Sequence, residues 1–326
     1  MFASYGHDHY YLPRGVSDPE TEVLSFPRTL APMLASSGSL PKADDEFAYE
    51  FKWDGIRAIV FLENGRVRIQ SRTLRDMTLE YPELEQLGYA TRQSRLVLDG
   101  ELICIGADGR PCFERIQSRI GRGKPLAIAF RQKAAPATLM VFDLLFQDGT
   151  DLRPASYSER RKRLDDLGLS GSCFQTPQAY VGGGAAVLQT ARDHQLEGVI
   201  CKRLGSRYRC GKRTDEWLKV KNRQTATFTI GGWVHDRDGR MEALLVGTPK
   251  WDGSLEFVSR VELGRFGQIM PLLESLRRKE SPFGFDLETR RARYVRPVLK
   301  AEFAFLYRTR SGWLREGCFK RLLAPA

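Results

Sequence analysis

The sequence predicts an α+β protein in which a domain of antiparallel sheets and helices precedes a small closed β-barrel. Up to Asn222, apolar runs of strand length alternate with helical segments. Beyond Asn222, short strands are separated by Gly, Asp and Asn. A chain of 326 residues with 42% hydrophobic residues can bury two cores. We therefore expect an N-terminal arm over residues 1–25, a larger domain over 26–222 and a barrel over 223–326.

The stretch EFKWDGIRA places Lys52 where a strand gives way to a turn. Residues 47–51 are apolar and aromatic and predict a strand, and Asp54-Gly55 is a strong turn signal before a second predicted strand at 56–62. Such a lysine has its backbone held by a sheet and its amine directed into the cleft that the turn borders. An amine attacks only when unprotonated, so a nucleophilic lysine needs an environment that disfavours the ammonium form. A solvated turn lysine is the alternative.

The next segments predict a hairpin, a helix and an unusual acidic residue. Asn64-Gly65 closes a hairpin onto a return strand at 66–72, which ends at Arg72. A helix is predicted at 78–87. Two short apolar strands, at 96–98 and 102–105, flank Asp99-Gly100-Glu101. A carboxylate in this position should be paired or bound to a ligand, so Glu101 is expected either to contact a ligand or to form a structural ion pair.

The second half of the larger domain supplies further polar residues on strands. Its helices are predicted at 113–121, 158–167 and 187–195. Phe142 lies in an apolar stretch, 137–145, that predicts a buried central strand. Glu197 precedes a buried strand that ends at Lys202. Lys219 and Lys221 alternate along one strand face, where they repel each other unless an anion lies between them. They are therefore phosphate-binding candidates, with solvated strand lysines as the alternative.

The C-terminal region predicts a five-stranded barrel with one helix. Strands are predicted at 227–234, 242–246, 255–261 and 301–307, and a helix at 271–279. A barrel of this size with aromatic strands and cationic loops is a common nucleic-acid-binding module.

Composition narrows the function classes. A net charge of +11 and a pI near 9.5 favour a polyanionic partner, nucleic acid before membrane. The apolar runs are too short for a membrane span and the N-terminus does not resemble a signal peptide, so we expect a cytoplasmic, nucleoid-associated protein. The six cysteines include no C-x-x-C pair, which favours reduced thiols over disulfides or a zinc site.

Together these residues predict a nucleotide pocket. An aromatic ring can stack on a base, one glutamate can accept ribose hydroxyls, another can hold a divalent metal, and paired lysines can neutralise the phosphate that an amine attacks. The residues in these roles are Phe142, Glu101, Glu197, Lys219 with Lys221, and Lys52. No G-x-x-x-x-G-K-S/T loop is present, so phosphate binding at a helix N-terminus is not expected.

The ordered series KWDGIR, SRT, DGE, FDLL, EGVICK and WLKVK resembles the covalent nucleotidyltransferases, and most closely the ATP-dependent DNA ligases. The resemblance implies a nucleotidyltransferase (adenylation) domain over 26–222 and an OB-fold domain over 223–326. The short form resembles compact bacterial ligases and the ligase part of bacterial end-joining proteins. It implies nick sealing in duplex DNA, in DNA repair.

The resemblance also implies roles for individual residues. Lys52 would carry AMP, Glu50 would lie near the adenine, and Phe142 would stack on it. The ribose and phosphate side would be contacted by Arg57, Arg72 and Glu101, the metal by Glu197 and Glu101, and the phosphates by Arg213, Lys219 and Lys221. ATP would donate AMP and Mg²⁺ or Mn²⁺ would assist. The partner would be nicked double-stranded DNA, bound without sequence preference by a monomer; no partner protein is indicated.

The C-terminus departs from the family pattern, which usually ends in an R-x-D-K motif. Here WLREGCFKR is followed by LLAPA, and the terminal Asp-Lys is absent. Two expectations stay open: self-adenylation from ATP is slower, or Arg315, Lys320 and Arg321 substitute.

Rival functions are weighed against a DNA ligase. RNA ligases and mRNA capping enzymes share the lysine motif, but the FDLL segment, the WLKVK spacing and the C-terminal tail favour a DNA ligase. An NAD-dependent ligase would need an N-terminal domain for which about fifty residues before Lys52 leave little room. A non-catalytic nucleic-acid-binding protein is the alternative of another class. The weakened C-terminal motif supports it, and the intact Lys52, Glu101, Glu197 and Lys219 argue against it.

Overall fold

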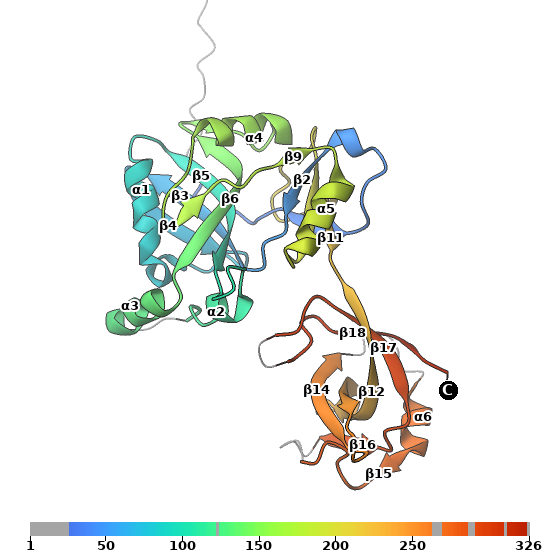
Figure 1. The fold of residues 1–326 in the computed structure, drawn as a ribbon. Helices are drawn as coiled ribbons and strands as arrows, with labels where there is room; N and C mark the ends of the chain where they lie inside the picture. Colours follow the sequence, from blue (N-terminus) through green and yellow to red (C-terminus); the bar gives the residue numbers. More distant parts are fainter. Residues whose placement is uncertain (1–25, 122–123, 263–268, 286–290, 310–311, 325–326) are drawn as a thin grey trace, which may run out of the picture.

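The computed structural model describes residues 26–121, 124–262, 269–285, 291–309 and 312–324. The predicted arm, residues 1–25, lies outside the described residues. Figure 1 shows two parts, one containing the elements up to β11 and the other containing β12 to β18. Within the described residues, no helix is long and apolar enough to cross a membrane.

The first sheet of the larger part has five strands. In spatial order they are β1 (Leu34–Ser37), β11 (Arg213–Lys221), β10 (Gly198–Arg203), β2 (Phe47–Phe51) and β9 (Tyr180–Val181). β10 pairs antiparallel with both β2 and β11, while β1 pairs parallel with β11. Helix α5 (Gly184–Asp193) packs on β2 and β10 through an apolar cluster that includes Val187, Leu188 and Tyr49.

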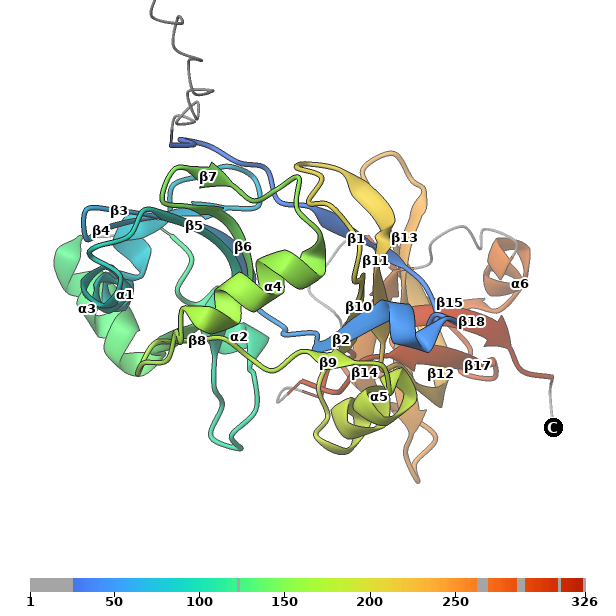
Figure 2. The ribbon, with the colours of Figure 1, turned by 90° about the horizontal axis from the view of Figure 1, so that it is seen from above.

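The second sheet is built around two long buried strands. Its order is β4 (Arg66–Ser71), β3 (Ile56–Glu63), β5 (Leu96–Cys104), β6 (Ala137–Gln147) and β7 (Thr150–Asp151), and β8 (Phe174–Gln175) pairs parallel with β6. The other helices of the larger part are α1 (Glu85–Ala90), α2 (Phe113–Gln117), α3 (Pro125–Ala134) and α4 (Tyr157–Asp166). Figure 2 shows α4 crossing beside β6, against which it packs.

The hairpin at Asn64-Gly65 is confirmed, because both residues have positive φ and β3 pairs with β4 on either side. The two strands predicted around Asp99-Gly100-Glu101 are wrong, since β5 is one nine-residue strand with bulges. It continues through this segment because β3 and β6 pair with it on both sides. A Cβ at Gly100 would lie 2.8 Å from the Met140 carbonyl oxygen, so glycine is needed where β5 approaches β6.

Helix boundaries differ where proline or strand pairing intervenes. The helix predicted at 78–87 is two 3₁₀ turns, Thr78–Glu80 and Pro82–Leu84, followed by α1. Pro82 interrupts it because proline restricts the preceding residue and lacks an N–H. The helix predicted at 113–121 ends at Gln117, and α3 was not predicted.

The second part is a curved sheet around its own apolar core. Its strands are β12 (Gln224–His235), β13 (Met241–Pro249), β14 (Leu255–Glu262), β15 (Arg277–Arg278), β16 (Ala292–Val295), β17 (Lys300–Phe305) and β18 (Cys318–Leu322). The long β12 pairs with β13 on one edge and with β16 and β17 on the other. Three of these strands, β15, β16 and β18, were not predicted. The predicted helix at 271–279 is α6 (Met270–Ser275), which ends before β15 pairs with β16.

Candidate active site

Lys52 lies where the chain passes from one sheet to the other. β2 belongs to the first sheet and β3 to the second, and residues 52–55 connect them. The Lys52 backbone N–H donates to the Gly198 carbonyl oxygen at 2.9 Å, which extends the pairing of β2 with β10. A Cβ at Gly55 would lie 2.2 Å from the Leu102 carbonyl oxygen, so only glycine allows the turn to pass this close to β5. The lysine is therefore held between the two sheets.

A single buried carboxylate joins two lysines. Lys52 Nζ lies 2.5 Å from Glu197 Oε2, and Lys221 Nζ lies 3.0 Å from Glu197 Oε1. Gly198, the next residue, has φ +144°, and a Cβ there would lie 2.1 Å from the Val220 carbonyl oxygen. Glycine at this position lets β10 approach β11, which brings Glu197 and Lys221 within ion-pair distance.

The cleft beside Lys52 has a volume of about 550 Å³ and is rich in cations. Most of the predicted nucleotide-site residues line it: Lys52, Arg57, Arg72, Glu101, Glu197, Arg213, Lys219 and Lys221. Lys219 and Lys221 share one face of β11, as predicted. Desolvation, together with the charges of Arg213 and Lys221, lowers the pKa of Lys219. Cations gathered this closely favour an anionic ligand.

Glu101 and Glu197, the two carboxylates predicted to hold a metal, both line this cleft. Desolvation raises the pKa of Glu101 to about 7, against the influence of Lys52 and Arg57, and the charge of Glu197 adds to the increase. Carboxylate oxygens suit Mg²⁺ or Mn²⁺, and Mg²⁺ usually binds one or two carboxylates together with substrate phosphates. Within the described chain, no group of three or more His, Cys, Asp or Glu is placed to hold a metal. Glu101 and Glu197 therefore fit a metal that a bound phosphate completes.

A smaller pocket adjoins the cleft and has the aromatic and apolar walls that a nucleobase needs. Glu50, Phe142, Ile200, Lys202 and Trp217 line it. Phe142 and Ile200 supply apolar surface, and Glu50 is a buried carboxylate in contact with Tyr157 and Lys202. Lys52 lines both cavities, so a nucleotide with its base here would place its phosphates beside Lys52.

Arg57 is more firmly held than the sequence suggested. Its guanidinium donates two hydrogen bonds to Asp99, at 2.6 and 2.7 Å, and lies 4.5 Å from the centroid of the Phe142 ring. It forms a wall of both cavities, with its donors directed to the protein. Arg213 similarly donates to the Ala35 carbonyl oxygen, whereas Arg72 is exposed at the cleft.

The C-terminal segment reaches the same cleft. Asp54 accepts hydrogen bonds from Tyr307 Oη at 2.8 Å and from Arg315 Nη2 at 3.2 Å. Both carboxylate oxygens of Glu316 lie 2.6 Å from Lys221 Nζ. Of the three expected substitutes for the missing Asp-Lys, Arg315 alone lines the cleft. Lys320 and Arg321 lie on β18, where Arg321 pairs with Glu302 at 3.3 Å.

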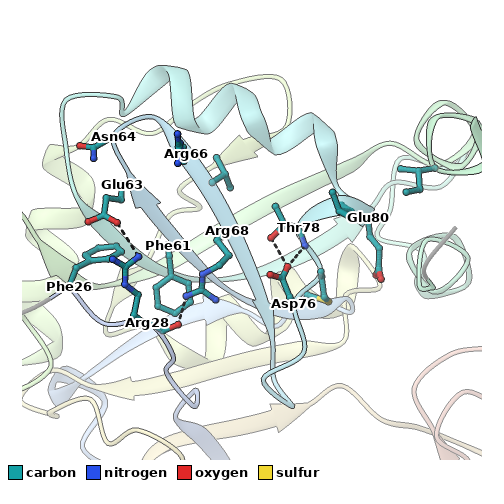
Figure 3. A pocket seen from close by; sticks show the side chains of 14 residues that line it. Phe26, Arg28, Phe61, Glu63, Asn64, Arg66, Arg68, Asp76, Thr78 and Glu80 are labelled. Atoms are coloured by element: carbon teal, nitrogen blue, oxygen red, sulfur yellow. Dashed lines mark hydrogen bonds and ion pairs between the residues drawn. The ribbon is translucent and has the colours of Figure 1, made fainter. Parts of the chain in front are cut away.

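A groove of about 1070 Å³ lies elsewhere (Figure 3). None of the predicted site residues lines it. Two of its arginines are already engaged: Arg28 pairs with Glu63 at 3.3 Å, and Arg68 lies 3.9 Å from the centroid of the Phe61 ring. This groove offers no constellation of reactive groups comparable to that around Lys52.

Comparisons with known proteins identify the family. The ATP dependent DNA ligase domain matches residues 32–221, and the ATP dependent DNA ligase C terminal region matches residues 237–323. The chain belongs to the ATP-dependent DNA ligase family. The family predicted from the ordered motifs is thereby confirmed, and the lysine of KWDGIR lies within the matched ligase domain.

Curated relatives of this chain include end-joining proteins. The multifunctional non-homologous end joining DNA repair protein LigD of Mycobacterium tuberculosis is 36% identical over 97% of this chain and 41% of its own length. LigD of Pseudomonas aeruginosa is 32% identical over 95% of this chain and 37% of that protein. A probable DNA ligase of Streptomyces coelicolor is 32% identical over 86% of this chain and 56% of that protein. The chain thus spans about 40% of the length of these LigD relatives.

Solved structures confirm the fold class. Mycobacterial DNA ligase D, solved in complex with ATP and MES, is 36% identical, with a TM-score of 0.57 and coverage of 90% of this chain and 95% of that one. A Lig E DNA ligase is 19% identical with a TM-score of 0.61, and covers 90% and 99%, respectively. The chain therefore has an α+β nucleotidyltransferase-type domain followed by an OB-fold domain, as predicted.

Sequence reasoning missed several residues that the fold brings to the candidate site. Asp54 and Lys202 lie inside the KWDGIR and EGVICK motifs, so those motifs could have indicated them. Tyr157, at the start of α4, and Glu316, in the C-terminal segment, reach the site only through tertiary packing. No local pattern distinguishes these two residues.

Proposed function

We propose that this protein is an ATP-dependent DNA ligase that seals nicks in duplex DNA through a lysyl-AMP intermediate on Lys52. The observation that carries the proposal is a pair of cavities that share wall residues, one a pocket suited to a base and the other a cationic cleft, with Lys52 lining both. ATP is the AMP donor, as family membership and the 36% identical ATP-bound neighbour support.

In the first step, Lys52 Nζ attacks the α-phosphorus of ATP. A phosphorus–nitrogen bond forms, the bond between the α-phosphorus and the bridging oxygen breaks, and pyrophosphate leaves; the amine proton passes to solvent. Phe142 and Glu50 hold the adenine, and Lys219 with Lys221 offsets charge on the phosphates. The Lys52 amine must first separate from the Glu197 carboxylate that now holds it.

Two further transfers complete sealing. A 5′-phosphate oxygen at the nick attacks the phosphorus of lysyl-AMP, so AMP passes to DNA and Lys52 is released. The 3′-hydroxyl then attacks the 5′-phosphate, forms the phosphodiester and expels AMP. Both transfers develop charge on phosphate oxygens, which the cationic residues Arg72, Arg213 and Lys219 are placed to offset.

A divalent metal fits this site. Glu197 and Glu101 would hold Mg²⁺ or Mn²⁺, as the position of both carboxylates in the cleft beside Lys52 supports. When bound, the metal offsets phosphate charge. Arg57, held by Asp99, supports the ring of Phe142 and borders the ribose side of the pocket.

The proposal also covers the domain boundaries, the DNA substrate and the cellular role. We assign residues 1–25 to an arm, 26–222 to the adenylation domain and 223–326 to the OB-fold domain; separate apolar cores on the two sides of Asn222 support the division. The OB-fold domain would bind nicked duplex through its phosphates, in a monomer, without sequence preference. The end-joining relatives support a role in DNA repair in the cytoplasm, at the nucleoid.

Intact-mass measurement tests the chemistry. Wild-type protein and Lys52→Ala are incubated with ATP and Mg²⁺, with pre-bound AMP excluded and pyrophosphate removed. We expect an acid-labile gain of one AMP in the wild type and none in the variant. A nicked duplex should then be sealed by the wild type alone.

The outcomes are distinct. No adduct in the wild type would overturn the ATP-driven ligase. If the protein forms the adduct but seals a nick in RNA and not in DNA, the proposal that DNA is the substrate would be overturned. The proposed covalent chemistry on Lys52 would still hold.

A further inference from the structure

Behind the base pocket lies a buried polar cluster formed by Glu50, Tyr157 and Lys202. The three residues come from β2, from the first turn of α4 and from β10, and their exposed fractions are 5%, 1% and 1%. Buried charges and hydroxyls are costly unless they are paired. The cluster joins three separate elements, and two of its members, Glu50 and Lys202, line the pocket, so its arrangement fixes the shape of the pocket wall.

The hydrogen bonds that the Glu50 side chain accepts within the described protein all end on one of its two carboxylate oxygens, Oε1. Its Oε1 accepts from Tyr157 Oη and from Lys202 Nζ, the latter at 2.8 Å. Arg161 Nη1 also approaches Oε1, at 3.9 Å. Among the described residues, no donor is recorded for Oε2, although Glu50 lines the pocket. The protein thus occupies one carboxylate oxygen and leaves the other for a ligand.

Lys202 connects this carboxylate to the aromatic walls. Its ammonium nitrogen lies 4.5 Å from the centroids of the Phe142 and Trp217 rings and 4.9 Å from that of Tyr157. It also donates to the Phe142 carbonyl oxygen at 3.1 Å. The ammonium therefore neutralises Glu50 and fixes β6, which carries the Phe142 ring, relative to β10.

The remaining oxygen has a defined chemical preference. A carboxylate that keeps its charge accepts hydrogen bonds and cannot donate them. The exocyclic amine of adenine is a donor, whereas the corresponding O6 of guanine or hypoxanthine is an acceptor that Glu50 Oε2 would repel. A site built around a hydrogen bond discriminates strongly against analogues that cannot make it.

We propose that Tyr157 and Lys202 are positioning residues for nucleobase selection, which hold Glu50 Oε1 so that Oε2 is presented to the exocyclic amine of adenine. The inference rests on the proposed use of ATP. Neither residue touches the reacting phosphorus, so their loss should change which nucleotide is used more than how fast the bound nucleotide reacts.

The test compares adenylation from ATP with the corresponding transfer from inosine triphosphate, which replaces only the 6-amine by a carbonyl. KM and the maximal rate of Lys52 labelling are measured for wild type, Tyr157→Phe and Lys202→Met. We expect the wild type to prefer ATP by about 100-fold or more in rate per unit concentration. In Tyr157→Phe the preference should fall about tenfold, mainly through a raised KM for ATP, with the maximal rate within about twofold.

Tyr208→Phe is the matched control, because Tyr208 is also buried and donates to a carboxylate, Asp99 Oδ2, at 2.6 Å. It should keep the wild-type ratio of ATP to inosine triphosphate use, even where its rate falls. Lys202→Met should lose more of the preference than Tyr157→Phe; if it does not fold, as judged by thermal unfolding, Tyr157→Phe decides.

The test distinguishes a failure of the proposed function from a failure of the positioning role. A wild type that forms no adduct from any nucleotide overturns the proposed function. A wild type that forms the adduct equally from both nucleotides, or a Tyr157→Phe variant that keeps the full preference, overturns the positioning role alone.

Discussion

At the scale of single residues, charges of alternating sign run through the cleft. Lys52 pairs with Glu197, Glu197 with Lys221, and Lys221 with Glu316. Glu316 is further held by Arg223, at 3.0 Å from its carboxylate, and its φ is +49°. A phosphate that reaches Lys221 must therefore compete with the Glu316 carboxylate.

Replacing Glu316 tests this competition. Glu316→Gln removes the charge that now occupies Lys221, so the KM for ATP in self-adenylation should fall about two- to fivefold, the amount that a partly exposed ion pair of about 0.5–1 kcal/mol allows. Steady-state labelling at several ATP concentrations measures it. Glu302→Gln is the control, because Glu302 pairs with Arg321 on β18 and not with a residue of the cleft. It should leave the KM for ATP unchanged. An unchanged KM in Glu316→Gln would contradict the competition.

Gly198 shows how a motif glycine shapes the site. Its φ of +144° and the 2.1 Å approach to the Val220 carbonyl oxygen leave no room for a side chain. Any Cβ must push β10 away from β11 or force the backbone out of its conformation. Either change separates Glu197 from Lys221.

Gly198→Ala should therefore lower the free energy of unfolding by about 3 kcal/mol or more, from backbone strain and disrupted pairing together. Chemical denaturation measures the loss. Gly205→Ala is the matched control, because no atom lies within 4 Å of its Cβ position, and its effect should stay within about 0.5 kcal/mol. Equal stability of the two variants would show that the close approach is not required.

At the scale of elements, α4 is fixed to β6 by a buried ion pair. A capping box of Ser156 and Glu159 starts the helix. Within it, Arg160 donates to Asp143 at 2.8 and 3.0 Å, and both side chains are fully buried. The same helix carries Tyr157, so this pair also sets the position of the tyrosine that contacts Glu50.

Asp143→Ala should cost about 3–5 kcal/mol, because it leaves the Arg160 guanidinium buried without a counter-charge. Asp166→Ala breaks an exposed pair with Lys162 on the same helix, and should cost no more than about 0.5 kcal/mol. Urea unfolding of both variants gives the comparison. A small loss in Asp143→Ala would mean that water or another acceptor replaces the carboxylate.

At the scale of the whole molecule, the contacts around Lys52 join the two parts. Each part has its own apolar core, while Asp54 and Lys221 of the larger part pair with Arg315 and Glu316 of the other. Such polar contacts are weakened by salt far more than an apolar interface would be. The arrangement that brings Arg315 to the cleft is therefore sensitive to ionic strength.

The double variant Arg315→Ala/Glu316→Ala should increase the radius of gyration measured by small-angle X-ray scattering at low salt, since the polar contacts that join the parts are lost. High salt should increase the radius of the wild type and change that of the double variant little. Arg321→Ala, whose partner Glu302 lies in the same part, is expected to match the wild type. A double variant with the wild-type radius would show that these contacts do not hold the parts together.

Much of the fold was predictable because local patterns match local structure. Asn64-Gly65 formed the expected hairpin, and alternation put Lys219 and Lys221 on one strand face. Local patterns gave a wrong prediction where pairing with distant strands determines the structure. The sequence predicted two short strands around Gly100, but β5 continues through it because β3 and β6 pair with it on both sides. Helix α3 was missed because none of its residues is buried, so no apolar stripe marks it.

The sequence alone determined the family, the ligase fold class and the strand-to-turn position of Lys52, because these depend on residue order and short-range spacing. The tertiary structure decided which groups meet: Tyr157 reaches Glu50 across 107 residues, and Arg315 reaches Asp54 across 261. Contacts at such separations depend on how sheets and parts pack, and not on any local pattern. The same packing directed the guanidinium of Arg57 to Asp99.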